Sequence, residues 1–292
     1  MKFQPVTHRG SGISLAVALI LLVVGIWLTN LMRQQPPSGL QFWSGLFALT
    51  SYGIALFFFY QAYALFRLAY FLTRNGLRIR YGAVTERIPI ENITNIIPAS
   101  DTTIPARQFL GIDLPYWWVG TWSNVGFYST VKPDRALRVQ TEQRDFLVSP
   151  SDTAAFMEAW QRRQTLGPTQ AWLQETRLWP FFNLPLWTDP LAWRLILGAL
   201  LVWLILVGST LSAYPNWPVN IPIGTDPQRQ VTTIVPREQF LWLPGIGGAI
   251  FLINLVLGII WHRKERLAAY LIWFLAILVQ IGLWVGLRML VG

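Results

Sequence analysis

Cysteine is absent from the sequence, histidine occurs only twice, and charged residues make up 13% of the 292 positions. Without cysteine, the chain has neither a disulfide framework nor a thiolate-bound metal or redox centre. The two histidines, His8 and His262, lie far apart in the sequence, so we expect no metal site. Soluble proteins carry about 25% charged residues. The low charged fraction, together with 53% hydrophobic residues, excludes a disordered chain and indicates a membrane protein.

Motifs for catalysis are missing as well. No glycine-rich phosphate loop follows a strand, and no Gly-x-Ser-x-Gly sequence occurs. None of the 14 acidic residues falls inside a predicted membrane span, whereas ion-coupled transporters and membrane hydrolases normally need a buried ionisable group. We therefore expect no enzyme activity, no catalytic residue and no cofactor.

Five apolar segments are long enough to cross a bilayer, which takes about 20 residues of helix. They cover about 13–32, 42–66, 191–213, 240–261 and 267–287. The last two are separated only by the basic turn 262–266, which predicts a helical hairpin. The first is longer than a typical signal-peptide core and has no small-residue cleavage site after it, so we expect a retained helix.

The distribution of lysine and arginine predicts the orientation of these spans. With the N-terminus inside, only Arg33, Arg229, Arg237 and Arg288 of the 23 basic residues lie on the outer side. The prediction is a multi-pass protein of the bacterial inner membrane, with a cytoplasmic N-terminus and an extracytoplasmic C-terminus. Since the net charge of +9 follows from this asymmetry, it does not indicate nucleic-acid binding.

The region between the second and third spans has a different character. Residues 77–81 and 84–90 alternate apolar and polar around Gly82–Ala83, which predicts a β-hairpin. Further strands are expected at 126–130, 136–141 and 144–148. After Ser149–Pro150 the period becomes helical, with Ser151 or Asp152 as the cap. The pattern predicts a small β-barrel or sandwich capped by a C-terminal helix.

Three segments of this region carry a resemblance to a known family. They are Thr73–Ile79 directly after a span, Arg87–Ile93, and Phe146–Pro150 leading into the last helix. The region resembles the bacterial pleckstrin-homology-like (PH-like) domains found in membrane proteins, and the resemblance covers about a third of the chain. It implies a PH-like fold and a membrane-tethered, non-catalytic role. The expected fold class is therefore an α+β membrane protein, with five transmembrane helices and an inserted cytoplasmic PH-like domain.

The expected organisation has four parts. They are a two-helix membrane hairpin at 1–72, the PH-like domain at 73–164, an aromatic and proline-rich interfacial linker at 165–190, and a three-helix membrane region at 191–292 with an extracytoplasmic loop at about 214–239.

Two groups of residues in the PH-like region are candidate contact sites. Arg78, Arg80 and Arg87 flank the hairpin, where the resemblance implies lipid-headgroup binding; each arginine near an anionic surface contributes about 1 kcal/mol. The alternative is an ordinary solvated strand face, since acidic and basic residues nearly balance in this region. The second group contains Tyr116, Trp117, Trp118 and Trp122, which either contact the membrane or a partner or belong to the core.

Polar residues are rare inside the spans, where Gln61, Asn254 and Gln280 occur. Asn254 and Gln280 lie near mid-membrane on the last two spans and are candidates for interhelical hydrogen bonds, to each other or to a third helix. Gly282 and Gly286 form a Gly-x-x-x-Gly face for close helix packing, within this chain or with another subunit.

These observations favour a non-enzymatic scaffold, accessory subunit or regulator that docks a partner protein through its PH-like domain. Recognition or handling of anionic lipid at the inner leaflet is the alternative, and a small-molecule transporter is a remote one. Expected partners are membrane lipids and a protein partner or membrane complex, and a homo-oligomer is possible.

Overall fold

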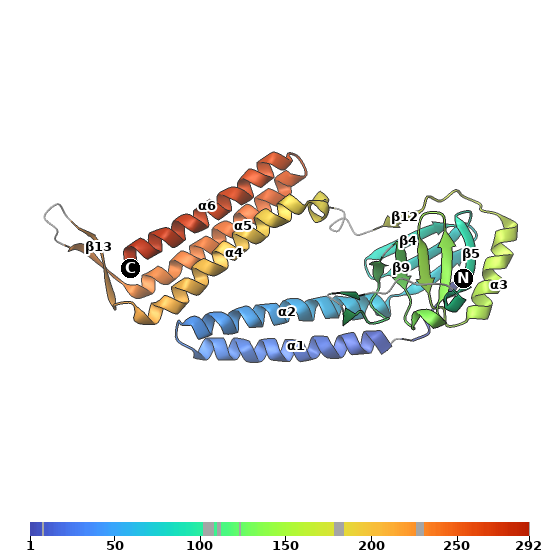
Figure 1. The fold of residues 1–292 in the computed structure, drawn as a ribbon, viewed down its shortest axis with the longest axis horizontal. Coiled ribbons are helices and arrows are strands. Elements are labelled where there is room, and N and C mark those ends of the chain that lie inside the picture. Colours follow the sequence, from blue (N-terminus) through green and yellow to red (C-terminus); the bar gives the residue numbers. More distant parts are fainter. Residues whose placement is uncertain are drawn as a thin grey trace. The chain divides into compact units, whose positions relative to one another are not determined.

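A computed structural model describes residues 1–7, 9–101, 108–109, 112–122, 124–177, 184–225 and 231–291 (Figure 1). The chain divides into two compact units. The first contains Met1–Leu22 and Gly53–Trp179, and the second contains Val23–Tyr52 and Pro180–Gly292. Each unit is described by itself.

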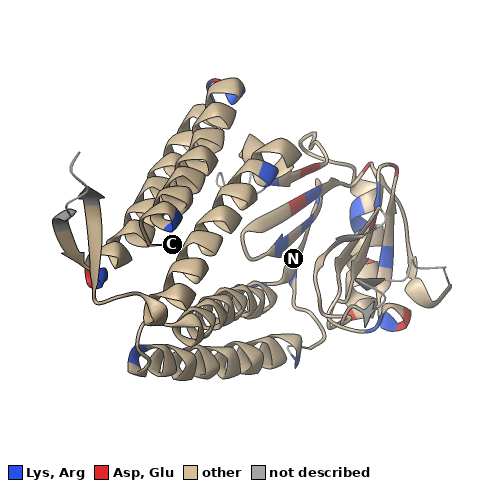
Figure 2. Ribbon diagram, turned by 60° about the vertical axis from the view of Figure 1, so that its left-hand side comes forward, with Lys and Arg blue, Asp and Glu red and all other residues tan. Residues whose placement is uncertain are grey.

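Five helices are long and apolar enough to span a membrane, as predicted. They are α1 (Arg9–Gln34), α2 (Gly39–Phe66), α4 (Pro190–Ala213), α5 (Trp242–His262) and α6 (Arg266–Val291). Charged residues are rare along them and concentrate in the β-rich part of the chain and near helix ends (Figure 2). Gly25 of α1 permits a close approach to α2, because a Cβ there would lie 2.6 Å from the Tyr52 ring. Next to it, the Thr29 hydroxyl lies 2.9 Å from the Tyr52 hydroxyl.

The first unit contains a β domain made of two five-stranded sheets. The first sheet is antiparallel and has the order β1 (Lys2–Phe3), β2 (Ala69–Thr73), β3 (Gly76–Tyr81), β4 (Val84–Pro89) and β12 (Glu175–Arg177). The predicted hairpin is β3–β4, and its turn contains Gly82 at φ +51°, a conformation that favours glycine. The sheet extends beyond the expected range 73–164, because β1, β2 and β12 lie largely or wholly outside it.

The second sheet has the order β5 (Ile93–Pro98), β10 (Leu137–Thr141), β11 (Asp145–Val148), β9 (Val125–Tyr128) and β8 (Gly120–Trp122). The strands predicted around 126–130, 136–141 and 144–148 are therefore confirmed. The two-residue strands β6 (Gln108–Phe109) and β7 (Ile112–Asp113) form a separate small pair. The alternative of a closed barrel is wrong. A barrel through both sheets would need β4 to pair with β5. Among the described strands, β4 instead pairs with β3 and β12, and β5 pairs with β10.

The core of the β domain lies between the sheets and α3 (Thr153–Leu166). Asp152 is the N-cap of α3 and accepts a hydrogen bond from the Ala155 amide at 2.8 Å, which confirms one of the two expected caps. From α3, Phe156 is fully buried and meets Phe3 edge-on with ring centroids 5.1 Å apart. The other large, fully buried side chains of this core come from the end of α2, the residue Leu68 after it, and strands β2, β3, β4 and β11: Leu65, Leu68, Tyr70, Leu72, Leu77, Ile79, Ile88 and Phe146.

In the second unit, α4, α5 and α6 pack together. The segment expected as a loop at 214–239 contains a hairpin of β13 (Asn220–Thr225) and β14 (Val231–Pro236). Tyr214, Trp217 and Phe240 anchor this hairpin region in an apolar cluster with Leu287 of α6. In the segment expected as a linker, part of the chain forms β12 and Pro185–Thr188 forms a short 3-10 helix. Trp179, Phe181 and Phe182 of that segment lie outside the described residues.

Candidate functional site

The outward face of the first sheet gathers basic side chains from four strands. Strand register aligns Lys2, Phe71, Arg78, Arg87 and Glu175 in one row across the sheet. The neighbouring row contains Arg80 and Arg177 on either side of Thr85. This face, called here the basic face, therefore carries five cations, which are Lys2, Arg78, Arg80, Arg87 and Arg177. The sequence singled out three of them; Lys2 and Arg177 join them only through strand pairing.

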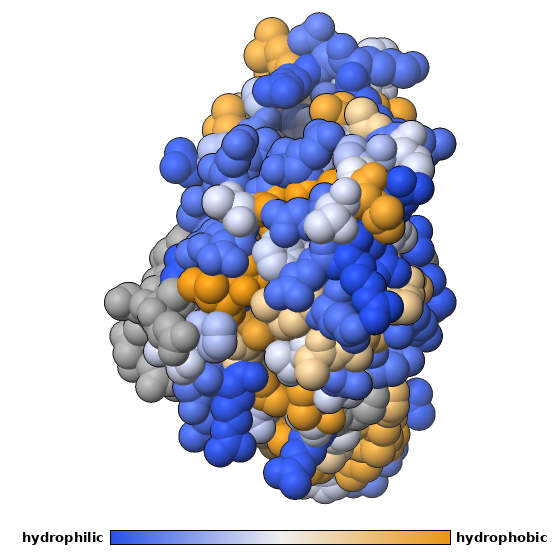
Figure 3. All heavy atoms as spheres, turned by 90° about the vertical axis from the view of Figure 1, so that its right-hand side faces the viewer, coloured by the Kyte–Doolittle hydropathy of each residue, from blue (hydrophilic) through white to orange (hydrophobic). Residues whose placement is uncertain are grey.

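Contacts within the basic face leave much of its charge available. The carboxylate of Glu175 binds both Arg87 at 3.1 Å and Arg177 at 2.6 Å. The Arg78 guanidinium lies 4.7 Å from the centre of the Phe71 ring, in a cation–π contact. Lys2 and Arg80 are exposed and have no ion-pair partner among the described residues. In the view of Figure 3, hydrophilic side chains cover most of the visible surface of the β domain.

The aromatic segment Tyr116–Trp118 is half-buried and packs against the chain's own helices. The Trp118 ring lies 5.5 Å from Phe57 of α2, centroid to centroid. Trp117 contacts the core of the β domain and the start of α1, where a Cβ at Gly10 would lie only 2.5 Å from it. The structure therefore favours internal packing for these two tryptophans. Trp122 belongs to β8, and its side chain lies outside the described residues.

A buried polar cluster joins the two sheets around Glu86, which is 1% exposed. Its carboxylate accepts hydrogen bonds from the Tyr128 hydroxyl at 2.7 Å, from Arg144 at 2.6 Å and from the Thr176 hydroxyl at 2.8 Å. Burial, followed by the negative charge of Glu86, raises the pKa of Tyr128 well above its usual range. An ion pair can be buried only when hydrogen bonds satisfy its groups, and the Glu86 carboxylate meets this condition.

Next to this cluster, the end of α2 and the two sheets line an open cavity of about 350 Å³. Gln61 of α2 lines it and accepts a hydrogen bond from the Tyr81 hydroxyl at 2.6 Å. Burial raises the pKa of Tyr81 above its usual range, so its hydroxyl remains a donor. Glu86 and Arg144 contribute charged groups to the wall, and Phe57 and Trp118 contribute aromatic rings. Gln61 was visible in the sequence as a rare polar residue in a span, but its partners were not.

Comparison with known proteins identifies this region. Residues 68–164 match the family model described as a bacterial PH domain. This region is a bacterial PH domain. The match confirms the resemblance carried by the sequence and moves its start to Leu68, so that β2 belongs to the PH domain. The chain matches no curated protein and no solved structure.

Outside the PH domain, the residues predicted to pack helices of the second unit lie in environments that differ from one another. Gln280 is buried and donates a hydrogen bond to the Gly247 carbonyl of α5 at 2.6 Å. Asn254 instead donates to the Ile250 carbonyl of its own helix at 2.9 Å, so the two amides do not bind each other. Apart from the chain neighbours and the backbone of the same helix, no heavy atom of the described chain lies within 4 Å of where a Cβ at Gly282 or Gly286 would stand.

A polar cluster that sequence reasoning missed joins three helices of the second unit. Asp189 is the N-cap of α4 and accepts hydrogen bonds from the amides of Leu191 and Ala192. Its other oxygen accepts from the Tyr270 hydroxyl at 2.5 Å and lies 2.8 Å from Nε2 of His262. The hydrogen bond from Tyr270, the largest cause, lowers the pKa of Asp189 well below its usual range. The Asp189–Pro190 dipeptide signals the cap in the sequence, but its other two partners are tertiary contacts.

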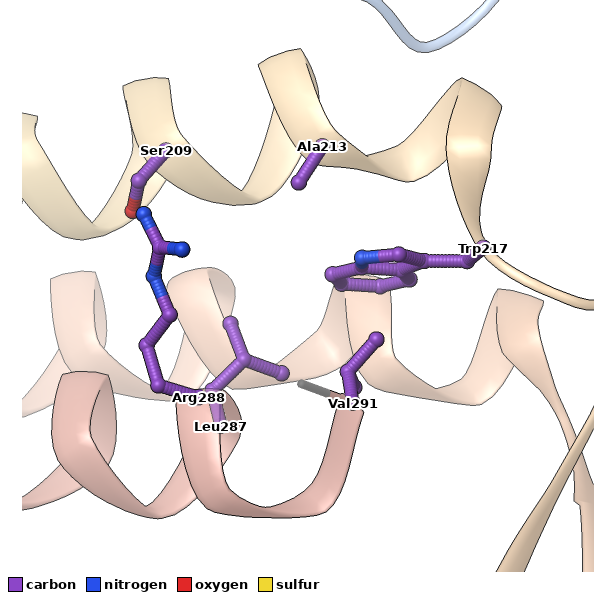
Figure 4. A pocket seen from close by; sticks show the side chains of 6 residues that line it. All are labelled: Ser209, Ala213, Trp217, Leu287, Arg288 and Val291. Carbon is purple, nitrogen blue, oxygen red and sulfur yellow. The ribbon is translucent and has the colours of Figure 1, made fainter.

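A smaller cavity lies between α4 and α6 (Figure 4). Its volume is about 80 Å³, and it is lined by Ser209, Ala213, Trp217, Leu287, Arg288 and Val291. Ligand sites have volumes of about 300–1,000 Å³, so this cavity is too small for one. Among the described residues, no group of three or more histidine, aspartate or glutamate side chains is arranged to hold a metal ion.

Proposed function

We propose that this chain is a non-enzymatic membrane scaffold, accessory subunit or regulator whose PH domain docks a partner protein at the cytoplasmic face of the bacterial inner membrane. The proposal rests on the basic face, where five cations are opposed by the single carboxylate of Glu175. Such a surface is complementary to an acidic segment of a partner, and complementary charge increases both association rate and specificity. Four of the five cations are arginines, which bind carboxylates through paired hydrogen bonds.

The basic face lies close to the end of α2. Strand β2 begins three residues after the end of α2, and the row with Arg80 and Arg177 aligns with Ala69 at its start. The row with Lys2, Arg78 and Arg87 lies two residues farther along the strands, which corresponds to about 7 Å. The basic face therefore begins beside the end of α2 and extends about 7 Å along the strands. Because attraction to anionic lipid reaches about one Debye length, roughly 8 Å, this position suits an acidic protein segment and anionic lipid alike, and cross-linking distinguishes them.

The experiment uses the full-length protein in native membranes, with a photo-crosslinking residue at position 85, which lies between Arg80 and Arg177 in the basic face and leaves all five cations in place. We expect one protein to be cross-linked, and expect Arg80→Glu combined with Lys2→Glu to abolish its co-purification with the chain. Arg135→Glu is the matched control, because Arg135 is an exposed arginine on a different part of the PH domain. Cross-linking to anionic lipid without a protein adduct would favour lipid recognition instead. Equal losses in the Arg80 and Arg135 variants would contradict a specific role of the basic face.

A further inference from the structure

We infer that the 350 Å³ cavity beside the end of α2 binds the head group of a zwitterionic phospholipid, with the acyl part of the lipid along Phe57 and Trp118. This site is separate from the basic face. It lies on the inner side of the first sheet, where Tyr81 and Glu86 point, whereas the basic face is on the outer side. Its volume lies within the range of about 300–1,000 Å³ that is typical of ligand sites.

The cavity lies beside the last turns of α2, which also pack into the core of the β domain through Ala64 and Leu65. Gln61 lies five residues before Phe66, the last residue of α2, which corresponds to about 7.5 Å along the helix axis. The polar layer on each side of the hydrocarbon core is about 5–7 Å thick. A cavity at this point of a membrane-spanning helix is therefore within reach of lipid head groups.

A buried donor of a residue that lines the cavity lacks an acceptor. The Gln61 side chain is 5% exposed, and its Oε1 accepts the hydrogen bond from Tyr81. Its Nε2 has no hydrogen-bond partner among the described residues. Because an unsatisfied buried donor is costly, this amide favours a ligand that presents an oxygen acceptor. A phosphodiester supplies such oxygens.

The charges of the wall favour a head group that is neutral overall. Glu86 and Arg144 form an ion pair at 2.6 Å, so their charges cancel. Both oxygens of Glu86 are occupied by Tyr128, Arg144 and Thr176, whereas Arg144 uses only Nη2 in hydrogen bonds to the described residues. The hydrogen-bonding groups that remain unused in the site are therefore donors. Because the wall is already neutral, a net anion would add an uncompensated charge to a partly buried site, whereas a phosphate balanced by its own ammonium group would not.

Aromatic rings complete the site. Tyr60 and Trp118 line the cavity, and aromatic rings stabilise an ammonium group through cation–π contacts. Phe57, whose ring lies 5.5 Å from that of Trp118, extends the apolar wall along α2. The arrangement places donors for phosphate, rings for ammonium and apolar contacts for the glycerol and acyl groups around one cavity.

Native mass spectrometry of delipidated full-length protein in detergent tests this inference. The probes are phosphatidylethanolamine, phosphatidylglycerol and diacylglycerol with identical acyl chains, together with water-soluble glycerophosphoethanolamine. We expect phosphatidylethanolamine to bind most tightly. Equal or tighter binding of phosphatidylglycerol or diacylglycerol would overturn the inference. Binding of glycerophosphoethanolamine as tight as that of the lipid would show that the site takes a soluble head group.

Two substitutions at Gln61 test the assignment of the donor. Gln61→Leu removes the amide, and we expect about 2- to 12-fold weaker phosphatidylethanolamine binding, the value of one hydrogen bond. Gln61→Glu keeps an acceptor for Tyr81 but replaces the donor by a second acceptor, so we expect a larger loss. Gln170→Leu, at an exposed position of the same unit, is the control and should bind as the unchanged protein does. Unchanged lipid affinity in both Gln61 variants, with unchanged melting temperatures, would refute the inference.

Discussion

Glu86 shows how one residue can be placed correctly by pattern and still have an unexpected role. The alternation of β4 puts residues 84, 86 and 88 on one face, and that face is the core. A carboxylate in such a position needs partners, and these come from β9, from Arg144 just before β11, and from β12. The sequence distance to those partners is 42 to 90 residues. No local pattern connects residues so far apart, which is why the cluster emerges only from the fold.

Replacing Glu86 is expected to destabilise the PH domain strongly. Glu86→Ala leaves Arg144 without its carboxylate and creates a cavity, and we expect a loss of about 3–5 kcal/mol in the free energy of unfolding. Chemical denaturation of the full-length protein, followed by tryptophan fluorescence, measures it. The control is Glu158→Ala, whose partner Arg162 lies on the same exposed face of α3, with both side chains more than 60% exposed. We expect that change to cost less than about 1 kcal/mol, and similar losses in the two variants would contradict this account.

Buried tyrosine hydroxyls make the PH domain sensitive to alkali. Burial raises the pKa of Tyr70 to about 12, and its hydroxyl donates to the Tyr128 carbonyl at 2.6 Å. In the unfolded chain the pKa is near 10, so the stabilisation is fully present below pH 10 and is lost as the pH rises through 12. Two pKa units correspond to about 3 kcal/mol. Melting temperatures measured between pH 9 and 12, together with tyrosinate absorbance, check this.

The matched variant for the alkaline effect is Tyr70→Phe. It lacks the titrating hydroxyl, so we expect lower stability at pH 7 because two hydrogen bonds, to Tyr128 and from the Ser149 amide, are lost. Its further loss of stability between pH 10 and 12 should be smaller than in the unchanged protein. An identical pH dependence in both proteins would show that other groups cause the alkaline unfolding.

At the scale of elements, Asp189 connects three helices, whereas an ordinary N-cap residue stabilises only its own helix. Asp189→Ala removes two cap hydrogen bonds of α4 and the contacts to His262 of α5 and Tyr270 of α6. We expect about 2–4 kcal/mol lower stability of the second unit, measured by thermal unfolding in detergent. Asp152→Ala, which removes the single cap of α3, is the comparison and should cost about 1 kcal/mol. Equal losses of stability in the two variants would mean that the contacts of Asp189 with α5 and α6 do not contribute to stability.

The folding pattern along the chain was predictable where an element has its own periodicity. The five long helices and the hairpin β3–β4 follow from uninterrupted apolar runs and from strict alternation. Strand β2 was not recognised because its residues, Ala69–Thr73, continue the apolar run of α2. Strands β1 and β12 contain only two and three residues, and pairing alone defines them. The basic face was therefore predicted in part, because two of its five cations come from these two strands.

At the scale of the whole molecule, the absence of cysteine gives a clean test of the proposed orientation. We expect Ala154→Cys, exposed on α3, to react with a membrane-impermeant maleimide only when the cytoplasmic side is accessible. Asn216→Cys, exposed between α4 and the β13–β14 hairpin, should react only from the opposite side. Labelling of intact spheroplasts and of inverted vesicles distinguishes these sides. Labelling of both positions from the same side would contradict an odd number of spans between them.

The pairing of β1 with β2 has a consequence for biosynthesis. Residues 2–3 leave the ribosome before α1 and α2, yet their strand partner follows α2, and the sheet is completed only by β12 at 175–177. At about 5–20 residues per second, translation separates β1 from β12 by roughly 9 to 35 s. In the membrane arrangement proposed above, the first two helices are inserted during that interval, while the sheet is incomplete. Once the sheet is complete, the pairing of β1 with β2 holds the start of α1 close to the end of α2. The finished β domain therefore keeps these two helices together.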